Sequence, residues 1–496
     1  MGVMRFLVNP TSGLDRLGPD VPVFLSGLDG RIFPTRVEIE GNVLTCRRPM
    51  SDSAKLSIPW PVEGFGTPVL TTTSLRDREE PYLLPVELAR GKLSEVREHC
   101  ASWEMAGMAV PEIYRDLQQG AFKDFAGCCA SQSQIIPCTE QAADAISRAC
   151  RAASILVDAY TVQRLNSIRR STFQAPGLLG CRLDSDVLSP DHSEVFRDAF
   201  NAADVPISWT RIEPREGDYH WDELDELTQW AHHHRLVPRG GPLIDLSCGG
   251  LPEWLAPWKS DFLNLPSFVC DFIETAVSRY VGKIRIWEVS AYGNSGGALD
   301  LGEDQRLALV ARTLEAAKGT DSDAQFFIRI DQPWGEYQRH GTHRLSPLQF
   351  VDALVRSNLG LGGVTLEINA GYGERACLSR DMLSVSRLID QWSLLGIPLH
   401  VNIACPAATG PDPKADSRFP VEEHVWRSNW SEETQEEWIE YLVPLLLAKP
   451  AVTGVFLSHF SDARPHRFPH AGLLDADKKP RTMLDPLRRQ LRHDLT

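Results

Sequence analysis

The chain has 496 residues, of which 43% are hydrophobic and 24% are charged, values that exclude low-complexity disorder as the main state. Its formal charge is −15, from 51 Lys and Arg against 66 Asp and Glu. An acidic surface repels phosphate backbones, so we expect no nucleic-acid partner. No apolar run reaches the length of a membrane span, and we expect no membrane partner.

The N-terminal residues 1–17 lack the basic start and apolar stretch of a signal peptide. The 11 cysteines are odd in number, and in a chain of this length they indicate a reduced interior. Both observations predict a cytoplasmic location.

Residues 1–80 are typical of a small antiparallel β-sandwich-like domain. Short apolar or alternating runs, separated by Gly-containing turns, predict strands at 21–25, 36–40, 43–47, 54–58 and 68–73. This domain could brace the rest of the chain or bind a ligand.

Residues 81–174 form a predicted helical linker region, because apolar residues recur at helical spacing over 85–99 and 142–168. Thr139 is a plausible N-cap for the second helix.

Residues 175–496 alternate between short β-rich runs and helical segments, which is the signature of successive βα units. The expected strands are 178–183, 205–210, 236–245, 283–290, 325–331, 363–369, 398–404 and 452–459. The fold class is therefore α/β, a (β/α)8 TIM barrel preceded by the β domain and the helical region. Active sites of such barrels lie at the carboxyl ends of the strands.

The barrel segment resembles the family-10 glycoside hydrolases, the xylanase family. Residues 207–222 place Glu213-Pro214 after a tryptophan and before a glycine, an aromatic pair and an aspartate, as the family does. Residues 236–243, 251–255, 284–289, 452–455 and 472–480 are similar to further family segments and follow in the family's order. The resemblance implies the barrel fold and a carbohydrate substrate.

The same resemblance implies a changed active site. The family's acid/base glutamate and the asparagine before it correspond to Tyr292 and Ala291, and its nucleophile corresponds to Ile403. Two further polar positions of the sugar site hold Gly241 and Ser208. Xylanase activity is therefore not carried over from the family.

The predicted strand ends carry other carboxyl groups, and we expect Glu367, Asp331 and Glu336 to be the catalytic candidates. Neighbouring strands lie about 4.8 Å apart, so carboxylates at their ends can reach the spacing of a glycosidase pair. Glu367 is the strongest candidate, because a glutamate in an apolar strand requires a partner or a purpose. The alternative is a structural charge paired with Arg329 or Arg375. Glu288 is expected to point toward the helix layer.

Candidate substrate contacts surround these carboxyls. The loop tryptophans Trp209 and Trp334 could stack on sugar rings, although ordinary packing stays open for both. Polar contacts to hydroxyl groups are expected from Asp245, Tyr292, Asn369 and His459. We expect no cofactor and no metal: no phosphate-binding loop or His-Glu-x-x-His motif occurs, and the His232–His234 run cannot share one helix face.

Two functions remain open. The first is a glycoside hydrolase-like protein that acts on a poly- or oligosaccharide with a rebuilt carboxylate site. The second is a non-catalytic carbohydrate-binding or scaffolding barrel, since a fold does not dictate a function. A lyase or isomerase that uses Tyr292 and His459 as proton shuttles is a weaker third possibility. The sequence does not predict the glycan or the oligomeric state.

Overall fold

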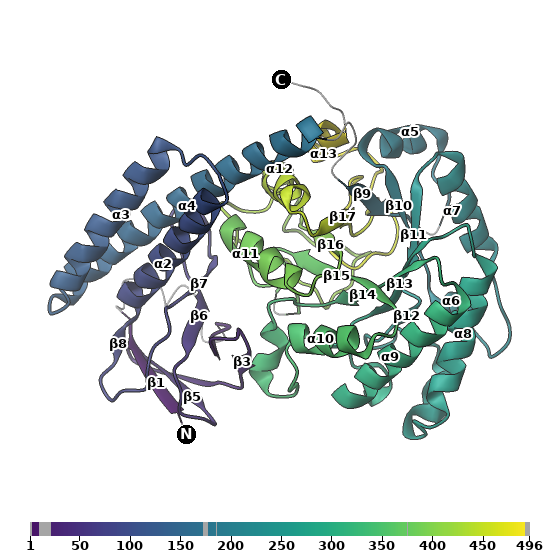
Figure 1. Ribbon diagram of the computed structural model, residues 1–496, viewed down its shortest axis with the longest axis horizontal. Coiled ribbons are helices and arrows are strands. Elements are labelled where there is room, and N and C mark those ends of the chain that lie inside the picture. The colour runs from purple at the N-terminus through teal and green to yellow at the C-terminus, as the bar shows by residue number, and fades with distance from the viewer. Residues whose placement is uncertain (1, 9–20, 172–176, 185, 374, 492–496) are drawn as a thin grey trace.

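The computed structural model describes residues 2–8, 21–171, 177–184, 186–373 and 375–491 (Figure 1). Most of the segment considered above for a signal peptide, from residue 9 onward, lies outside these residues. The N-terminal β unit, the helices α2, α3 and α4, and the barrel follow one another along the chain. In Figure 1 the β unit lies at the lower left, the helices lie above it, and the barrel lies to the right.

The N-terminal β unit consists of two four-stranded sheets. The first has the order β4-β5-β1-β8, with β1 at Gly2–Leu7, β4 at Arg36–Glu40, β5 at Val43–Arg48 and β8 at Tyr82–Leu83. The second has the order β3-β2-β6-β7, with β2 at Phe24–Ser26, β3 at Ile32–Phe33, β6 at Lys55–Pro59 and β7 at Val69–Thr71. All strand pairs except β1–β8 are antiparallel. The predicted small antiparallel β domain is therefore confirmed.

Three helices follow the β unit: α2 at Leu84–Met105, α3 at Glu112–Ala130 and α4 at Ile135–Ser171. The N-cap predicted at Thr139 is wrong, because α4 begins one turn earlier and the Thr139 hydroxyl donates to the carbonyl of Ile135 at 2.8 Å. Pro137 permits the early start, since the third helical residue needs no backbone donor.

Helix α4 contributes to two apolar cores. Its first half, including Ile146, packs in the same buried cluster as the β unit. Its second half, including Leu156 and Val157, packs in the cluster that fills the barrel and its helix layer.

The barrel is a closed ring of parallel strands, as predicted. The order is β11-β10-β9-β17-β16-β15-β14-β13-β12, and an additional β11–β13 pairing closes it. The strands are β9 at Leu178–Arg182, β10 at Ala202–Pro206, β11 at Val237–Gly241, β12 at Ile244–Asp245, β13 at Ile286–Ala291, β14 at Gln325–Ile330, β15 at Leu361–Asn369, β16 at Leu399–Ala404 and β17 at Val452–Leu457. Strands β11 and β12 are two halves of the third barrel strand, interrupted at Pro242, which has no N–H to donate.

The helices of the barrel lie outside the strands (Figure 1). They are α5 at Pro190–Ala199, α7 at Asp222–His233, α8 at Leu265–Arg279, α9 at Glu303–Thr320, α10 at Pro347–Ser357, α11 at Met382–Ser393, α12 at Glu432–Ala448 and α13 at Leu484–Leu491. Shorter turns are α6 at Trp209–Ile212, η1 at Glu253–Ser260, η2 at Ala298–Asp300 and η3 at Glu336–His340.

The second barrel strand differs from its predicted bounds of 205–210, because β10 already ends at Pro206 and a helical turn begins at Trp209. The strand begins with two alanines, which have a weak strand preference. The residues with a strong strand preference are Val205 and Ile207, so the strand was predicted too late in the sequence. As a result, Trp209 lies on α6 and not on a strand.

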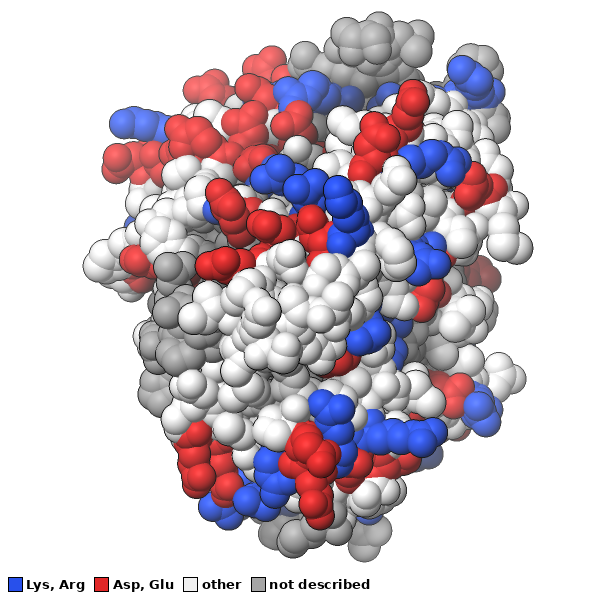
Figure 2. All heavy atoms as spheres, turned by 90° about the vertical axis from the view of Figure 1, so that its left-hand side faces the viewer, with Lys and Arg blue, Asp and Glu red and all other residues white. Residues whose placement is uncertain are grey.

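The surface and the helices give two further observations. Figure 2 shows the face formed by the β unit and helices α2–α4, on which acidic and basic side chains are interspersed around an uncharged central area. Within the described ranges, no helix has both the length and the apolar character of a membrane span.

We expect Gly91→Ala to lower the stability of the fold. Gly91 lies in α2 where the helix meets β7, and an added Cβ would collide with the main-chain oxygen of Thr71. Overpacking of this kind costs about 1–3 kcal/mol. The measurement is the free energy of unfolding in urea. The matched control is Gly319→Ala, at an open position of α9, which should instead gain about 0.5–1 kcal/mol. Equal effects of the two changes would contradict the close α2–β7 contact.

Candidate active site

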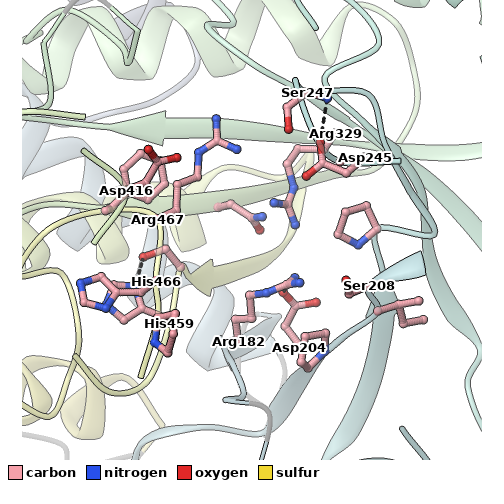
Figure 3. A pocket seen from close by; sticks show the side chains of 18 of the residues that line it. Arg182, Asp204, Ser208, Asp245, Ser247, Arg329, Asp416, His459, His466 and Arg467 are labelled. Carbon is pink, nitrogen blue, oxygen red and sulfur yellow. Dashed lines mark hydrogen bonds and ion pairs between the residues drawn. The ribbon is translucent and has the colours of Figure 1, made fainter. Parts of the chain in front are cut away.

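A cavity of about 680 Å³ opens at the carboxyl ends of the barrel strands (Figure 3). This volume is in the range of small-molecule sites, which is about 300–1,000 Å³. The predicted site residues that line it are Trp209, Asp245, Tyr292, Glu367 and His459. Asp331, Glu336, Trp334 and Asn369 are not among its lining residues.

Glu367 lies on β15 and is only 3% exposed. Its Oε2 accepts a hydrogen bond of 2.7 Å from the Tyr292 hydroxyl and lies 3.8 Å from Nη1 of Arg329. Its Oε1 has no hydrogen-bond partner within the described part of the chain. One oxygen of this carboxylate is thus held by the protein, and the other has no donor among the described residues.

Tyr292 follows the fourth barrel strand with a backbone φ of 59°, in the left-handed region that non-glycine residues rarely adopt. Strained backbone of this kind occurs often at functional sites. Burial raises the pKa of Tyr292 well above its ordinary value, so the phenol keeps its proton and donates to Glu367. The guanidinium of Arg467 covers the ring, with its central carbon 4.2 Å from the ring centroid.

Asp331 follows β14 directly, next to Glu367 on the neighbouring strand, since Ile330 pairs with Leu366. Burial and the negative charge of Glu367 raise the pKa of Asp331 to about 7. The Ser295 hydroxyl donates to its Oδ2 at 2.8 Å. Asp331 and Glu367 are therefore two neighbouring carboxyls of which one retains its proton to near neutral pH, as general acid–base chemistry requires.

A second set of charged and polar side chains lies inside the barrel and includes Asp204 and Asn402, which also line the cavity. Arg239 is fully buried and lies 3.0 Å from Asp204, 3.7 Å from Glu288 and 3.0 Å from Asn402. The predicted outward orientation of Glu288 is wrong, because Glu288 also pairs with Arg329 inside the barrel. Trp287 takes the outward position and packs near Tyr280, which follows α8.

We expect Arg239→Leu to cost about 3–5 kcal/mol of unfolding free energy, because it leaves two buried carboxylates short of a counter-charge. Urea unfolding measures this loss. Arg312→Leu is the control, because Arg312 forms an exposed ion pair with Glu315, and such pairs contribute at most about 1 kcal/mol. An equally small loss of unfolding free energy in both variants would contradict this expectation. It would show that Arg182 and Arg329 alone balance the negative charges of Asp204 and Glu288.

The remaining predicted residues have specific protein partners. Glu336 forms an ion pair of 2.8 Å with Arg380, whose guanidinium also lies 5.0 Å from the Trp334 ring. Asn369 accepts a hydrogen bond of 2.8 Å from the main-chain nitrogen of Cys377. None of these three predicted residues is among the lining residues of the cavity.

Three residues on the wall itself also have protein contacts. The Trp209 ring stacks on Phe272 with centroids 4.5 Å apart, which covers one face. Asp245 accepts from the main-chain nitrogen of Ser247 at 2.8 Å, and Nε2 of His459 lies 2.7 Å from Asp462. Asp245 and His459 nevertheless line the cavity and can contact a ligand there.

Sequence reasoning missed Asp184 and Arg467, which also line the cavity. Burial raises the pKa of Asp184 to about 6. Its position directly after the first strand could have identified it by the same rule that identified Asp331. Arg467 lies in the irregular segment after β17, where no periodic pattern indicates which way its side chain points.

His459, Asp462 and His466 form a group of possible metal ligands on the same wall.

Residues 169–292 match the family described as "Glycosyl hydrolase family 10". The barrel is a divergent relative of the family-10 glycoside hydrolases. This match confirms the resemblance inferred from the sequence motifs. The chain is glycosidase-like in that its barrel is related to this family.

Individual family-10 relatives match parts of the barrel. An endo-1,4-beta-xylanase C from Paenibacillus barcinonensis is 30% identical over 121 residues, covering 22% of this chain and 11% of that protein. An endo-1,4-beta-xylanase 3 from Hypocrea jecorina is 27% identical over 194 residues, covering 38% of this chain and 52% of that protein. The chain thus spans about half or less of the length of these curated relatives.

Solved family-10 structures align over more of the barrel at lower identity. A family-10 hydrolase from Paenibacillus barcinonensis has 18% identity and a TM-score of 0.49, covering 65% of this chain and 97% of that one. Xylanase 10B from Thermotoga maritima has 16% identity and a TM-score of 0.49, covering 64% of this chain and 95% of that one.

Proposed function

We propose that this chain hydrolyses a glycosidic bond of a poly- or oligosaccharide, with Glu367 and Asp331 as its carboxyl pair. The observation that carries the proposal is the pairing itself: two buried carboxyls lie at the ends of adjacent strands, and the pKa of one is raised to about 7. Glycoside hydrolysis needs one carboxyl acid and one carboxylate at such positions.

The surroundings support a role for each carboxyl. Tyr292 and Arg329 stabilise the charge of Glu367, which suits a nucleophile or a base. Asp331 keeps its proton to near neutral pH and is the acid that protonates the leaving oxygen. Asp331 lies outside the lining of the cavity, so the substrate has to open a path from the cavity to this carboxyl. Asp245, which lines the cavity, is the substitute acid.

The spacing of the two carboxyls determines the stereochemical course. Adjacent strand ends favour the separation of about 5–5.5 Å that belongs to retaining enzymes. A separation of about 6.5–9.5 Å would leave room for a water molecule and give inversion. A sugar ligand is supported by the polar lining of the cavity, which includes Tyr292, Asp245 and His459, and by the family-10 relationship.

A non-catalytic carbohydrate-binding barrel is the second candidate. It is favoured by the contact of Arg329 with Glu367, because an ion pair can hold a buried carboxylate for structural reasons alone.

A hydrolysis screen distinguishes the two candidates. Purified protein is incubated with a panel of soluble poly- and oligosaccharides at pH 6, and new reducing ends are measured beside calorimetric binding. We expect cleavage of at least one β-linked glycan. Binding of a glycan without cleavage would favour the non-catalytic barrel. Neither cleavage nor binding across the panel would contradict both candidates.

A further inference from the structure

Three histidines and two aspartates converge on one side of the cavity. His459, Asp462, His466 and His470 belong to the segment after β17, and Asp412 belongs to the loop between β16 and α12. Donor atoms of His459, Asp462 and His466 all lie within 4.8 Å of one another, as do those of Asp412, Asp462 and His470. Figure 3 shows His459 and His466 next to each other on the cavity wall.

The hydrogen bonds of two of these histidines determine which ring nitrogen carries the proton. In His466, Nδ1 lies 2.8 Å from the carbonyl oxygen of Arg464. In His470, Nε2 lies 2.7 Å from the carbonyl oxygen of Gly410. A carbonyl can only accept, so these nitrogens are the N–H donors. In a neutral ring, the second nitrogen then directs its lone pair toward a carboxylate.

The facing distances are short. Nε2 of His466 lies 2.9 Å from Oδ2 of Asp412 and 3.8 Å from Oδ1 of Asp462. Nδ1 of His470 lies 3.7 Å from the same Asp412 oxygen. A lone pair and a carboxylate repel each other unless a proton or a metal cation lies between them. Anchoring of the other ring nitrogen by a backbone carbonyl is how proteins orient histidines that bind metals.

The charges of the group also favour a bound cation. Asp462 has one arginine partner, Nη1 of Arg481, at 2.7 Å. The ion pairs of Asp412 within the described residues are with His466 and His470 only. Two carboxylates are therefore held close together, and only that of Asp462 has an arginine partner among the described residues.

We propose that this group binds a divalent transition-metal ion, of which Zn²⁺ is the best match. Nε2 of His466, Oδ2 of Asp412 and Oδ1 of Asp462 are the central ligands, and His459 or His470 supplies the next one. Imidazole nitrogens and carboxylate oxygens are ligands that zinc accepts. Two atoms bound to zinc at tetrahedral angles are roughly 3.4 Å apart. The separations between these nitrogen and oxygen atoms, from 2.7 to 3.8 Å, bracket that value.

The ion would join two loops that form one wall of the cavity. Asp412 lies in one loop, and the other ligands lie in the segment that also carries Arg467 over the Tyr292 ring. Metal binding would therefore fix the position of Arg467. This proposal is independent of the proposed hydrolysis, because it concerns the stability of the wall and not the carboxyl pair.

The test is zinc binding to untagged, chelator-treated full-length protein at pH 7.5, measured by calorimetry. We expect one Zn²⁺ per chain in the wild type, and affinity at least about tenfold weaker in Asp412→Asn and in His466→Gln. The control is His233→Ala, because His232 and His233 at the end of α7 are exposed histidines to which zinc could also bind. This variant should bind as the wild type does.

Thermal unfolding with and without zinc separates binding from a folding defect. Zinc should raise the melting temperature of the wild type and of His233→Ala, and leave that of folded Asp412→Asn unchanged. The proposal is overturned if zinc binds Asp412→Asn and His466→Gln as tightly as the wild type, or if only His233→Ala loses binding. It is equally overturned if the wild type binds no Zn²⁺, Co²⁺ or Mn²⁺, since His466 would then be an imidazolium paired with the aspartates.

Discussion

Glu367→Gln is expected to lower kcat for glycan hydrolysis by about 10²–10⁴-fold while leaving the protein folded. Glutamine has the size of glutamate and can still accept the Tyr292 hydrogen bond, which is 2.7 Å long in the wild type. It cannot carry the negative charge that a nucleophile or base needs. Arg329 keeps its second partner, Glu288, so the arginine is not left without a counter-charge. The measurement is the rate of reducing-end release on the best substrate of the screen.

The matched control for this variant is Glu87→Gln. Glu87 is also a buried glutamate with an arginine partner, Arg90 at 3.0 Å, but it lies on α2, outside the barrel. Its kcat should equal that of the wild type. If Glu367→Gln kept full activity while it still bound the glycan, hydrolysis would take place without Glu367 and the proposed pair would be wrong.

Asp331→Asn is expected to make the protein more stable at pH 8 than the wild type, and to change its stability little at pH 4. The pKa of Asp331 is about 7 in the fold against 3.8 for an ordinary aspartate, because of burial and of Glu367. Between these values the native state holds a proton that the unfolded state has released, so wild-type stability falls as pH rises from about 4 to about 7. Asparagine has no proton to lose.

The size of this effect follows from about 1.4 kcal/mol for each pKa unit. A rise from 3.8 to about 7 therefore gives a difference of about 4 kcal/mol at pH 8. Urea unfolding of both proteins at several pH values measures it, and other titrating groups cancel in the difference. A difference that does not change with pH would show that the pKa of Asp331 is not raised. In the active enzyme, the same deprotonation is expected to lower kcat/KM above pH 7.

Much of the barrel could be predicted from the sequence, because its strands are short apolar runs between helices of ordinary length. The runs that end near Asp331 and Glu367 were placed within about two residues, and side chains at such ends must gather at one rim of a parallel barrel. Strand 205–210 was placed three or four residues late, because the first part of β10 consists of residues with weak strand preference.

Contacts between distant segments could not be predicted. The bond between Tyr292 and Glu367 joins residues 75 positions apart, and the register of the barrel alone brings them together. The direction of Glu288 depends on which side of β13 faces the helices, and Trp287 occupies that side. Arg467 and the histidines after β17 lie in irregular backbone, where no period indicates which side chains meet.

Helix α4 has a consequence for fragments of this chain. Its 37 residues contribute to the apolar core of the β unit at one end and to that of the barrel at the other. A recombinant fragment that began near residue 175 would expose the barrel surface that Leu156, Val157 and Leu165 cover. Such a fragment is expected to aggregate, however complete its ring of strands. Trimming the chain to a minimal soluble unit therefore has to retain α4.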